Sequence, residues 1–263
     1  MPGRGMPLSR PLGSRCMKPK RIEILGVPVD CLTMDRTIEL ADLALTGDVA
    51  QSIVAVNPEK VMRARIDAGL RGQMQRAAVL IPDGIGVVAA ARMLGLGHFD
   101  RVPGSELMPK LCELAARTGR RVFLYGASPE VNERTVKVLG ERYRGLKISG
   151  AQHGYLKDEE MPGLIDRINR SKTDIVFVAL GSPKQEAWID RYLPQLNVKL
   201  CQGVGGTFDV ISGHVNRAPA AFRAVHLEWF YRLAANPNRL ARQSALPGFV
   251  FQVFKQRLEG KAN

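Results

Sequence analysis

The chain has few cysteines and histidines and no long apolar run. Its four cysteines, Cys16, Cys31, Cys112 and Cys201, form no Cys-x-x-Cys pair, and its four histidines are scattered. These spacings give no sign of a metal site and predict reduced thiols, as in cytosolic proteins. No run of about 18 apolar residues occurs, so we expect no segment that spans a bilayer.

The first twenty residues lack the apolar core of a signal peptide. This segment, residues 1–20, is rich in glycine, proline and arginine, and we expect it to be a disordered basic tail. A start of translation at Met6 or Met17 fits the same pattern and would shorten the tail.

Positive charge is concentrated at the two ends of the chain. The formal net charge is +13, of which residues 1–21 contribute +6 and residues from 217 onward another +6. The near-neutral body argues against a nucleic-acid groove across the fold, whereas basic ends fit contact with an anionic surface. An alternative interpretation is that the chain is a basic nucleic-acid-binding protein, although it contains no recognisable nucleic-acid-binding motif.

From Arg21 onward, short apolar strands alternate with helical segments. Such alternation predicts an α/β fold, with a Rossmann-like, largely parallel sheet flanked by helices. We expect a catalytic domain over 21–216 and a helical, basic C-terminal appendage over 217–263. The expected strands are 21–27 and 29–32, a hairpin around Pro28, then 52–56, 77–81, 121–125, 146–151, 174–180 and 198–203. The expected helices are 34–45, 58–68, 106–118 capped by Ser105, one from Ser128-Pro129, 159–169 and one from Ser182.

The segment 79–89, Val-Leu-Ile-Pro-Asp-Gly-Ile-Gly-Val-Val-Ala, places Asp83 where an apolar strand meets a helix start. Substrates of α/β proteins bind at this edge, and the helix N–H groups favour anions such as diphosphate. In one alternative, Asp83 only caps this helix. Gly84 to Ala89 also match the G-x-G-x-x-A fingerprint, so a second alternative is that the protein is an NAD(P)-binding Rossmann oxidoreductase. A loop stands where that fingerprint requires an acidic strand end, which weakens the second alternative.

Three further turns combine small residues with a polar or basic group before a helix. They are Arg101-Val-Pro-Gly104, Gly181-Ser-Pro-Lys-Gln185 and Gly203-Val-Gly-Gly-Thr-Phe-Asp209. Backbone N–H groups in such turns contact phosphate, although each turn alone is also typical of a simple tight turn. Because several are expected at one edge of the sheet, they predict a nucleotide-binding site.

The chain contains no Asp-x-Asp pair, the usual carboxylate clamp for the metal ion of a nucleotide-sugar diphosphate. Cationic side chains would then neutralise a diphosphate bound here. Arg101 is the candidate, and its alternative role is a surface salt bridge with Asp100 or Glu106.

Five motifs occur in order along the chain: Val56-Asn-Pro-Glu59, Ile81-Pro-Asp-Gly-Ile-Gly86, Arg101-Val-Pro-Gly-Ser105, Gly181-Ser-Pro-Lys-Gln-Glu186 and Gly203-Val-Gly-Gly-Thr-Phe-Asp209. Together they resemble the WecG/TagA/CpsF glycosyltransferase family, over about residues 21–242. The resemblance implies inverting, metal-independent transfer of a sugar from a UDP-sugar to a polyprenyl-diphosphate-linked acceptor, in surface polysaccharide biosynthesis. The family's donors carry N-acetylmannosamine, its uronic acid or glucose, and the sequence does not choose among them.

The resemblance also implies roles for individual residues. Asp83 is the general base, Arg101 steadies the diphosphate, and Gln185 and Asn57 position the substrates. No metal and no other cofactor is implied. The remaining predicted substrate-binding residues are Gly84, Gly86, Gly104, Ser105, Gly126, Gly181, Pro183, Lys184, Gly205, Phe208 and Asp209, with Arg232, Arg239 and Arg242 from the appendage. Two positions depart from the family: Ala55 stands where members such as TagA carry threonine, and Glu106 where many carry aspartate.

The C-terminal segment mixes aromatic and basic residues. We expect helices at 218–235 and 239–244, and a further aromatic-basic stretch at 249–258. One interpretation is a helix packed on the domain with a solvated basic face. The other is a segment that contacts an anionic membrane, which would make the protein peripheral on the cytoplasmic face. The expected partners are therefore the UDP-sugar, the lipid-linked acceptor and the membrane surface, with no nucleic acid, and a homo-oligomer is left open.

Overall fold

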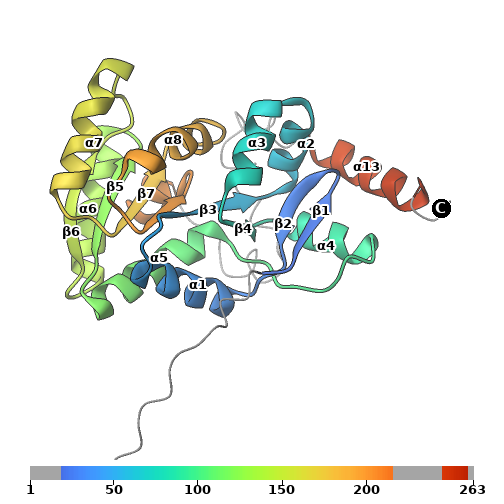
Figure 1. The fold of residues 1–263 in the computed structure, drawn as a ribbon, viewed down its shortest axis with the longest axis horizontal. Coiled ribbons are helices and arrows are strands. Elements are labelled where there is room, and N and C mark those ends of the chain that lie inside the picture. The colour runs from blue at the N-terminus through green and yellow to red at the C-terminus, as the bar shows by residue number, and fades with distance from the viewer. Residues whose placement is uncertain (1–18, 216–244, 260–263) are drawn as a thin grey trace, which may run out of the picture.

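A six-stranded parallel sheet lies at the centre of the protein in the computed structural model, which describes residues 19–215 and 245–259. Its strands are β3 (Gln51–Val56), β4 (Val79–Pro82), β5 (Arg121–Gly126), β6 (Lys147–Gln152), β7 (Ile175–Ala179) and β8 (Leu200–Gly203). They lie in the order β4-β3-β8-β7-β5-β6, and each neighbouring pair is parallel (Figure 1). The α/β fold expected from the sequence is confirmed.

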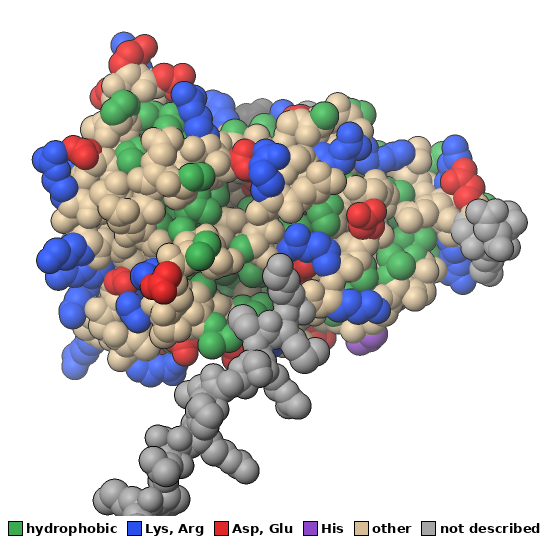
Figure 2. Space-filling model, in the orientation of Figure 1, with side chains coloured by type: hydrophobic (Ala, Val, Ile, Leu, Met, Phe, Trp, Pro, Cys, Tyr) green, Lys and Arg blue, Asp and Glu red, His purple; other side chains and the backbone are tan. Residues whose placement is uncertain are grey.

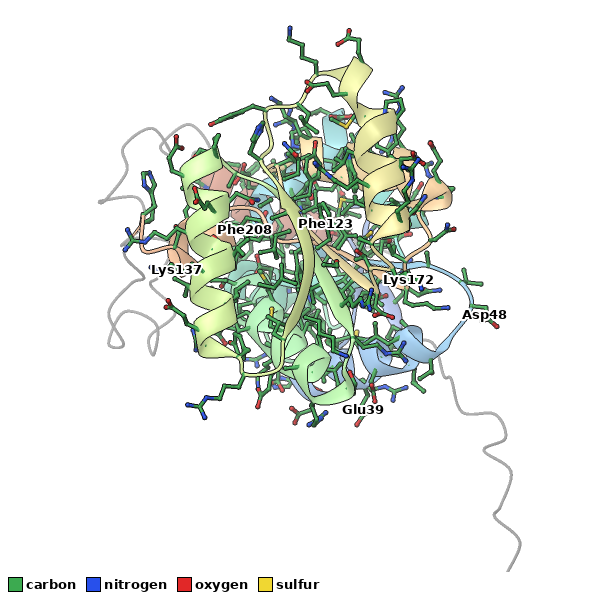
Figure 3. The ribbon with its side chains drawn as sticks, turned by 90° about the vertical axis from the view of Figure 1, so that its left-hand side faces the viewer. Glu39, Asp48, Phe123, Lys137, Lys172 and Phe208 are labelled. Carbon is green, nitrogen blue, oxygen red and sulfur yellow. The ribbon has the colours of Figure 1, made fainter. Side chains whose placement is uncertain are left out.

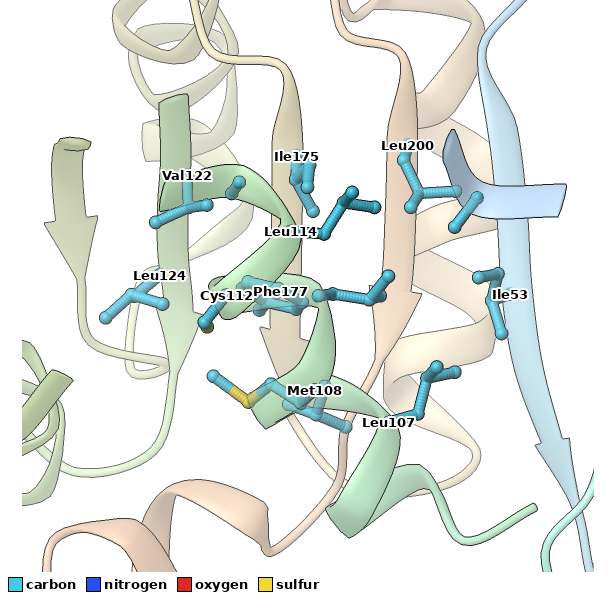
Figure 4. Close-up of a cluster of buried hydrophobic side chains, with 14 of the residues drawn as sticks. Ile53, Leu107, Met108, Cys112, Leu114, Val122, Leu124, Ile175, Phe177 and Leu200 are labelled. Atoms are coloured by element: carbon cyan, nitrogen blue, oxygen red, sulfur yellow. The ribbon is translucent and has the colours of Figure 1, made fainter. Parts of the chain in front are cut away.

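Alternate residues of each strand face opposite sides of the sheet, as the period of two requires. On one side, Ile53, Leu124 and Phe177 pack against helices. These helices are α1 (Met34–Thr46), α5 (Gly104–Thr118), α6 (Pro129–Arg142) and α9 (Thr207–Ile211). Figure 4 shows α5 lying across this face, with Leu107 and Met108 directed into the buried cluster.

The other face of the sheet is covered in two parts. Over β5 and β7, Phe123 packs with α7 (Met161–Arg170) and α8 (Lys184–Tyr192), and the short 3-10 helices Asp158–Glu160 and Leu193–Gln195 adjoin them. Figure 3 shows α6 and α7 on opposite sides of the edge strand β6, with Phe208 and Phe123 in the two layers. Over β3 and β4 lie α2 (Pro58–Ile66), α3 (Ala68–Arg76), α4 (Ile85–Met93) and α13 (Ala245–Glu259).

An antiparallel hairpin of β1 (Arg21–Ile24) and β2 (Val27–Asp30) packs against β4. The hairpin was expected, but its turn is at Leu25 and Gly26, both with positive φ angles, and Pro28 lies inside β2. Fully buried Asp30 accepts hydrogen bonds from Arg21 Nε at 2.7 Å and from the Leu80 N–H at 2.8 Å. This carboxylate therefore fastens the hairpin to the sheet.

Some boundaries differ from the expected ones. The helix expected over 58–68 is interrupted because Asp67 ends α2 and caps α3, accepting the Leu70 N–H at 2.9 Å. Helix α5 begins at Gly104 with Pro103 as its N-cap, so Ser105 lies in the first turn and does not cap the helix. The stretch expected at 249–258 is part of α13.

Several expectations fall on residues outside the described ranges. They are the N-terminal tail up to residue 18 and the helices at 218–235 and 239–244. Within 19–215 and 245–259, no helix has the length and apolar character needed to cross a membrane.

Candidate active site

A cavity of about 500 Å³ opens at the carboxyl ends of β3, β4, β7 and β8. Its walls come from the first turns of α2, α4, α5 and α8, from the loop after β8, and from α13. The chain leaves β3 for α2 on one face of the sheet and leaves β8 for α9 on the other. Connections that diverge in this way leave a crevice in which open α/β sheets bind their ligands.

Asp83 follows β4 directly and is held from two sides. Its backbone N–H donates to the Val56 carbonyl at 2.9 Å, and its Oδ1 accepts the Gly104 N–H at 2.9 Å. Helix α4 has Gly84, a residue without a side chain, as its N-cap. The Asp83 carboxylate joins the end of β4 to the first turn of α5, in the cavity wall.

Arg101 reaches the same cavity because the next residue fixes the loop before α5. Val102 is fully buried, and its N–H donates to the Pro82 carbonyl at 2.8 Å. Gly104 and Ser105, at the start of α5, line the cavity beside Arg101. The N-terminus of this 15-residue helix adds partial positive charge to that of the guanidinium. Together they suit a diphosphate group.

Gln185, in the first turn of α8, lines the cavity with a side chain that is almost fully buried. Its Oε1 accepts the Gly205 N–H at 2.9 Å, and its Nε2 donates to Glu186 Oε1 at 3.0 Å. A Cβ at Gly203 would lie 2.8 Å from Gln185 Nε2, so glycine at the end of β8 lets the strand approach this side chain closely. Gln185 thus joins the turn after β7 to the turn after β8.

A buried ion pair, Lys60 with Glu186, lies beside this glutamine, and the sequence reasoning missed it. Lys60 Nζ is 2.7 Å from Glu186 Oε1 and donates to the Ala55 carbonyl at 2.5 Å. Burial raises the pKa of the Glu186 carboxyl, but the Lys60 charge and hydrogen bonds from Lys60, Gln185 and Ser182 outweigh it, and the net pKa is lowered. Because Glu186 Oε1 also accepts from Gln185, the pair orients the Gln185 amide.

The buried amide of Gln202 on β8 is a second polar group that the sequence reasoning missed. Its Nε2 donates to the Gly104 carbonyl at 3.3 Å. The same Gly104 donates its N–H to Asp83. Gln202 therefore supports the helix start that holds the candidate base.

Asn57 begins α2, and its Oδ1 accepts the Lys60 N–H at 2.8 Å, so it caps this helix while lining the cavity. Gly84 and Gly86 also line the cavity, where they lie against Pro58 of the same helix. A Cβ would be 2.8 Å from Pro58 Cδ at position 84 and 2.7 Å from Pro58 Cγ at position 86. Close helix packing therefore accounts for both glycines of the G-x-G-x-x-A match.

Five predicted binding residues do not line the cavity. Gly126 ends β5 at a φ of 121°, and a Cβ there would collide with the Ala179 carbonyl of β7. Phe208 is fully buried in the core beneath α6 (Figure 3). The other three are Pro183 and exposed Lys184 at the start of α8, and Asp209 on α9.

Of the remaining predicted site residues, some line the cavity and others lie outside the described residues. Gly181 and Gly205 line the cavity. Ala55, the departure from the family pattern, lines it as well, within van der Waals reach of a Cβ placed at Gly104. Arg232, Arg239 and Arg242 lie outside the described residues.

Helix α13 supplies an apolar wall of the cavity through Leu246, Phe249, Val250 and Val253. Phe249 and Val253 are buried in the cluster that contains α2 and α4, and Figure 1 shows α13 beside these helices. At its other end, Gln256 Oε1 accepts the Leu25 N–H at 3.1 Å. The interpretation of a helix packed on the domain therefore holds for the inner side of α13.

The parallel sheet and a cavity that unites a carboxylate, a guanidinium and helix N-termini are typical of α/β proteins that bind phosphate-bearing ligands. A model of the glycosyl transferase WecG/TagA/CpsF family matches residues 22–263. The chain belongs to this family of glycosyltransferases.

Three relatives carry the name N-acetylglucosaminyldiphosphoundecaprenol N-acetyl-beta-D-mannosaminyltransferase. One, from Bacillus spizizenii, is 38% identical over 77% of this chain and 78% of its own length. Another, from Staphylococcus aureus, is 34% identical over 90% of this chain and 93% of its own. The third, from Bacillus subtilis, is 36% identical over 80% of this chain and 81% of its own.

Proposed function

We propose that this glycosyltransferase moves a sugar from a UDP-sugar to a polyprenyl-diphosphate-linked sugar acceptor, with inversion and without a metal ion. The observation that carries the proposal is the meeting of Asp83, Arg101 and Gln185 in one cavity of a chain from this family. The names of the relatives make N-acetylmannosamine the first sugar to test and N-acetylglucosaminyldiphosphoundecaprenol the first acceptor. Glucose and the uronic acid of N-acetylmannosamine are the next donor sugars to test.

In the proposed reaction, Asp83 accepts the proton of the acceptor hydroxyl. The hydroxyl oxygen forms a bond to the anomeric carbon of the donor while the bond from that carbon to the UDP oxygen breaks on the opposite face. The hydrogen bond from the Gly104 N–H holds the carboxylate in place. A positioned general base typically contributes about 10²–10⁴-fold to the rate.

Arg101 and the start of α5 stabilise the negative charge that grows on the β-phosphate as UDP leaves. Lys60 is not available for this role because it is 4% exposed and paired with Glu186. Gln185, held by Gly205 and Glu186, presents a fixed edge to the substrates. This assignment leaves the compensation of charge to side chains and backbone rather than to a metal ion.

We further propose that the protein docks on the anionic cytoplasmic face of the membrane through its basic C-terminal region. The outer side of α13 exposes Val250, Phe251, Phe254 and Leu258, whose helical spacing places them within one apolar stripe. Lys255 and Arg257 lie on the same helix, and Figure 2 shows hydrophobic and charged side chains together at this end of the molecule. An apolar stripe with basic neighbours is typical of interfacial helices.

A UDP-release assay tests the reaction. The full chain is given each UDP-sugar in turn, with a polyprenyl-diphosphate-linked N-acetylglucosamine acceptor and excess EDTA. We expect release that depends on the acceptor with one donor of the panel. If no donor of the panel gives UDP release, the proposed reaction is wrong. If EDTA abolishes UDP release and magnesium restores it, the proposed metal independence is wrong.

A further inference from the structure

One side of the cavity is apolar and takes no part in the chemistry assigned above. It lies between α4 and α13 and is called here the apolar channel. Its side chains are Ala89, Met93, Phe249, Val250 and Val253. The groups assigned to the reaction lie near the other end, where α4 begins next to Asp83, and Glu59 and Arg63 of α2 also line the cavity.

The channel starts close to the candidate base and leads away along α4. The nearest atom of Phe249, Cε1, would be 3.8 Å from a Cβ at Gly86, only three residues after Asp83. Met93 ends α4, ten residues after Asp83, which corresponds to about 15 Å at the rise of an α-helix. The cavity is therefore polar near Asp83 and apolar along this length.

The channel also opens onto the exposed side of α13. Val250 lines the cavity, yet its side chain is 45% exposed. Phe254 and Leu258 follow at intervals of four residues and are 50% and 70% exposed, so they continue the same face of the helix. A ligand that leaves the channel at Val250 meets a continuous apolar surface.

We infer that the apolar channel binds the first isoprene units of the acceptor, with the acceptor sugar at Asp83, its diphosphate between Asp83 and the channel, and the rest of the chain passing along α13 toward the bilayer. This inference rests on the proposed function. A polyprenyl diphosphate matches the cavity along its length, because its anionic head is followed by hydrocarbon just as the polar end of the cavity is followed by the apolar channel. The uracil of the donor fits the channel poorly, because its polar edge would be buried among side chains that make no hydrogen bonds.

Chain-length dependence tests the subsite. Val250→Ser and a control, Ile66→Ser, are compared in detergent solution; Ile66 is an apolar residue on α2 that is 89% exposed and does not line the cavity. Two acceptors carry the same sugar diphosphate, one on a long polyprenyl chain and one on a short water-soluble alkyl group. Loss of about two buried methyl groups should raise the KM of Val250→Ser for the long-chain acceptor about tenfold. The KM values for the short acceptor and for the donor should match those of the control.

Three results would overturn the inference. An equal rise in KM for both acceptors would show that the chain is not what Val250 contacts. A rise in the donor KM would place the nucleotide in the channel, and an unchanged KM for the long-chain acceptor would remove the subsite while transfer itself persists. Absence of transfer by the unmodified protein with every donor would instead overturn the proposed function, and the subsite with it.

Discussion

Replacing Lys60 by methionine tests the energetics of the ion pair beside the site. The substitution keeps most of the side-chain length but removes the charge that neutralises Glu186, a residue 2% exposed. Removing one partner of a buried ion pair costs about 3–5 kcal/mol. That is a large part of the roughly 5–15 kcal/mol that stabilises a typical domain. We expect a loss of this size in the free energy of unfolding, measured by urea denaturation at pH 8.

Two comparisons separate burial from charge. Arg76 and Asp190 form a pair with the same 2.7 Å separation, but the Arg76 side chain is 62% exposed. Arg76→Met should cost far less than Lys60→Met because water screens an exposed pair. The double variant Lys60→Met, Glu186→Gln should recover most of the loss, since the amide is neutral and its oxygen still accepts from Gln185. A residual cost of about 1–2 kcal/mol is expected for lost hydrogen bonds.

The pH dependence of the loss follows from the direction of the pKa shift. In the unmodified protein the Glu186 pKa lies below its ordinary 4.5, so the pair stabilises the fold above that value and loses this contribution as pH falls through the lower, folded pKa. Without Lys60, burial dominates and raises the Glu186 pKa. Protonation then relieves the buried charge, so the cost of Lys60→Met should shrink from pH 8 toward pH 5. A cost equal to that of Arg76→Met, or one independent of pH, would refute this reasoning.

Three further predictions concern the proposed reaction. Asp83→Asn should keep the fold and UDP binding, because its amide oxygen still accepts the Gly104 N–H, yet lower turnover by about 10²–10⁴-fold; near-normal turnover would leave Asp83 with a structural role only. Transfer should survive EDTA, whereas Arg101→Ala should lose most of its turnover, and a strict requirement for added magnesium would disprove the cationic role. Truncation before Arg217 should abolish vesicle co-sedimentation and transfer and, by removing buried Phe249 and Val253, lower the free energy of unfolding by about 3–6 kcal/mol. Full activity of the truncated chain on a lipid-linked acceptor would contradict a role for the C-terminal region in the site.

Local patterns predicted the sheet and the position of Asp83 because these depend on short stretches of sequence. The apolar strand over β4 and the glycine after Asp83 are visible within six residues. Parallel strands bring their carboxyl ends to one edge, so Arg101, Gln185 and Gly205 could be expected near Asp83 from their places after strands or before helices. The cavity brings these residues together.

Contacts between distant residues were not predictable in this way. Lys60 and Glu186 are 126 positions apart, and each alone is typical of a solvated helix surface. The available signal was the placement of Lys60 on the side of α2 that carries Val61 and Ala64, which are buried. Phe208 was assigned to the site as part of the family motif at 203–209, whereas its apolar side chain belongs to the core. The sequence of such a turn indicates that a residue lies near the cavity, but it does not show whether the side chain faces the cavity or the core.

The hydrogen bond between Leu25 and Gln256 joins residues 231 positions apart, and it has a consequence for how the molecule is made. Contacts between residues far apart in the sequence form late in folding, because the intervening chain loses conformational entropy before the contact contributes any favourable free energy. During synthesis the hairpin emerges before the sheet and α13 emerges after all six of its strands, so Phe249 and Val253 reach the cluster over β3 and β4 only after the sheet has been synthesised. The cavity therefore acquires the wall formed by α13 after its other described walls, and a chain that stops before α13 carries the candidate catalytic edge without it.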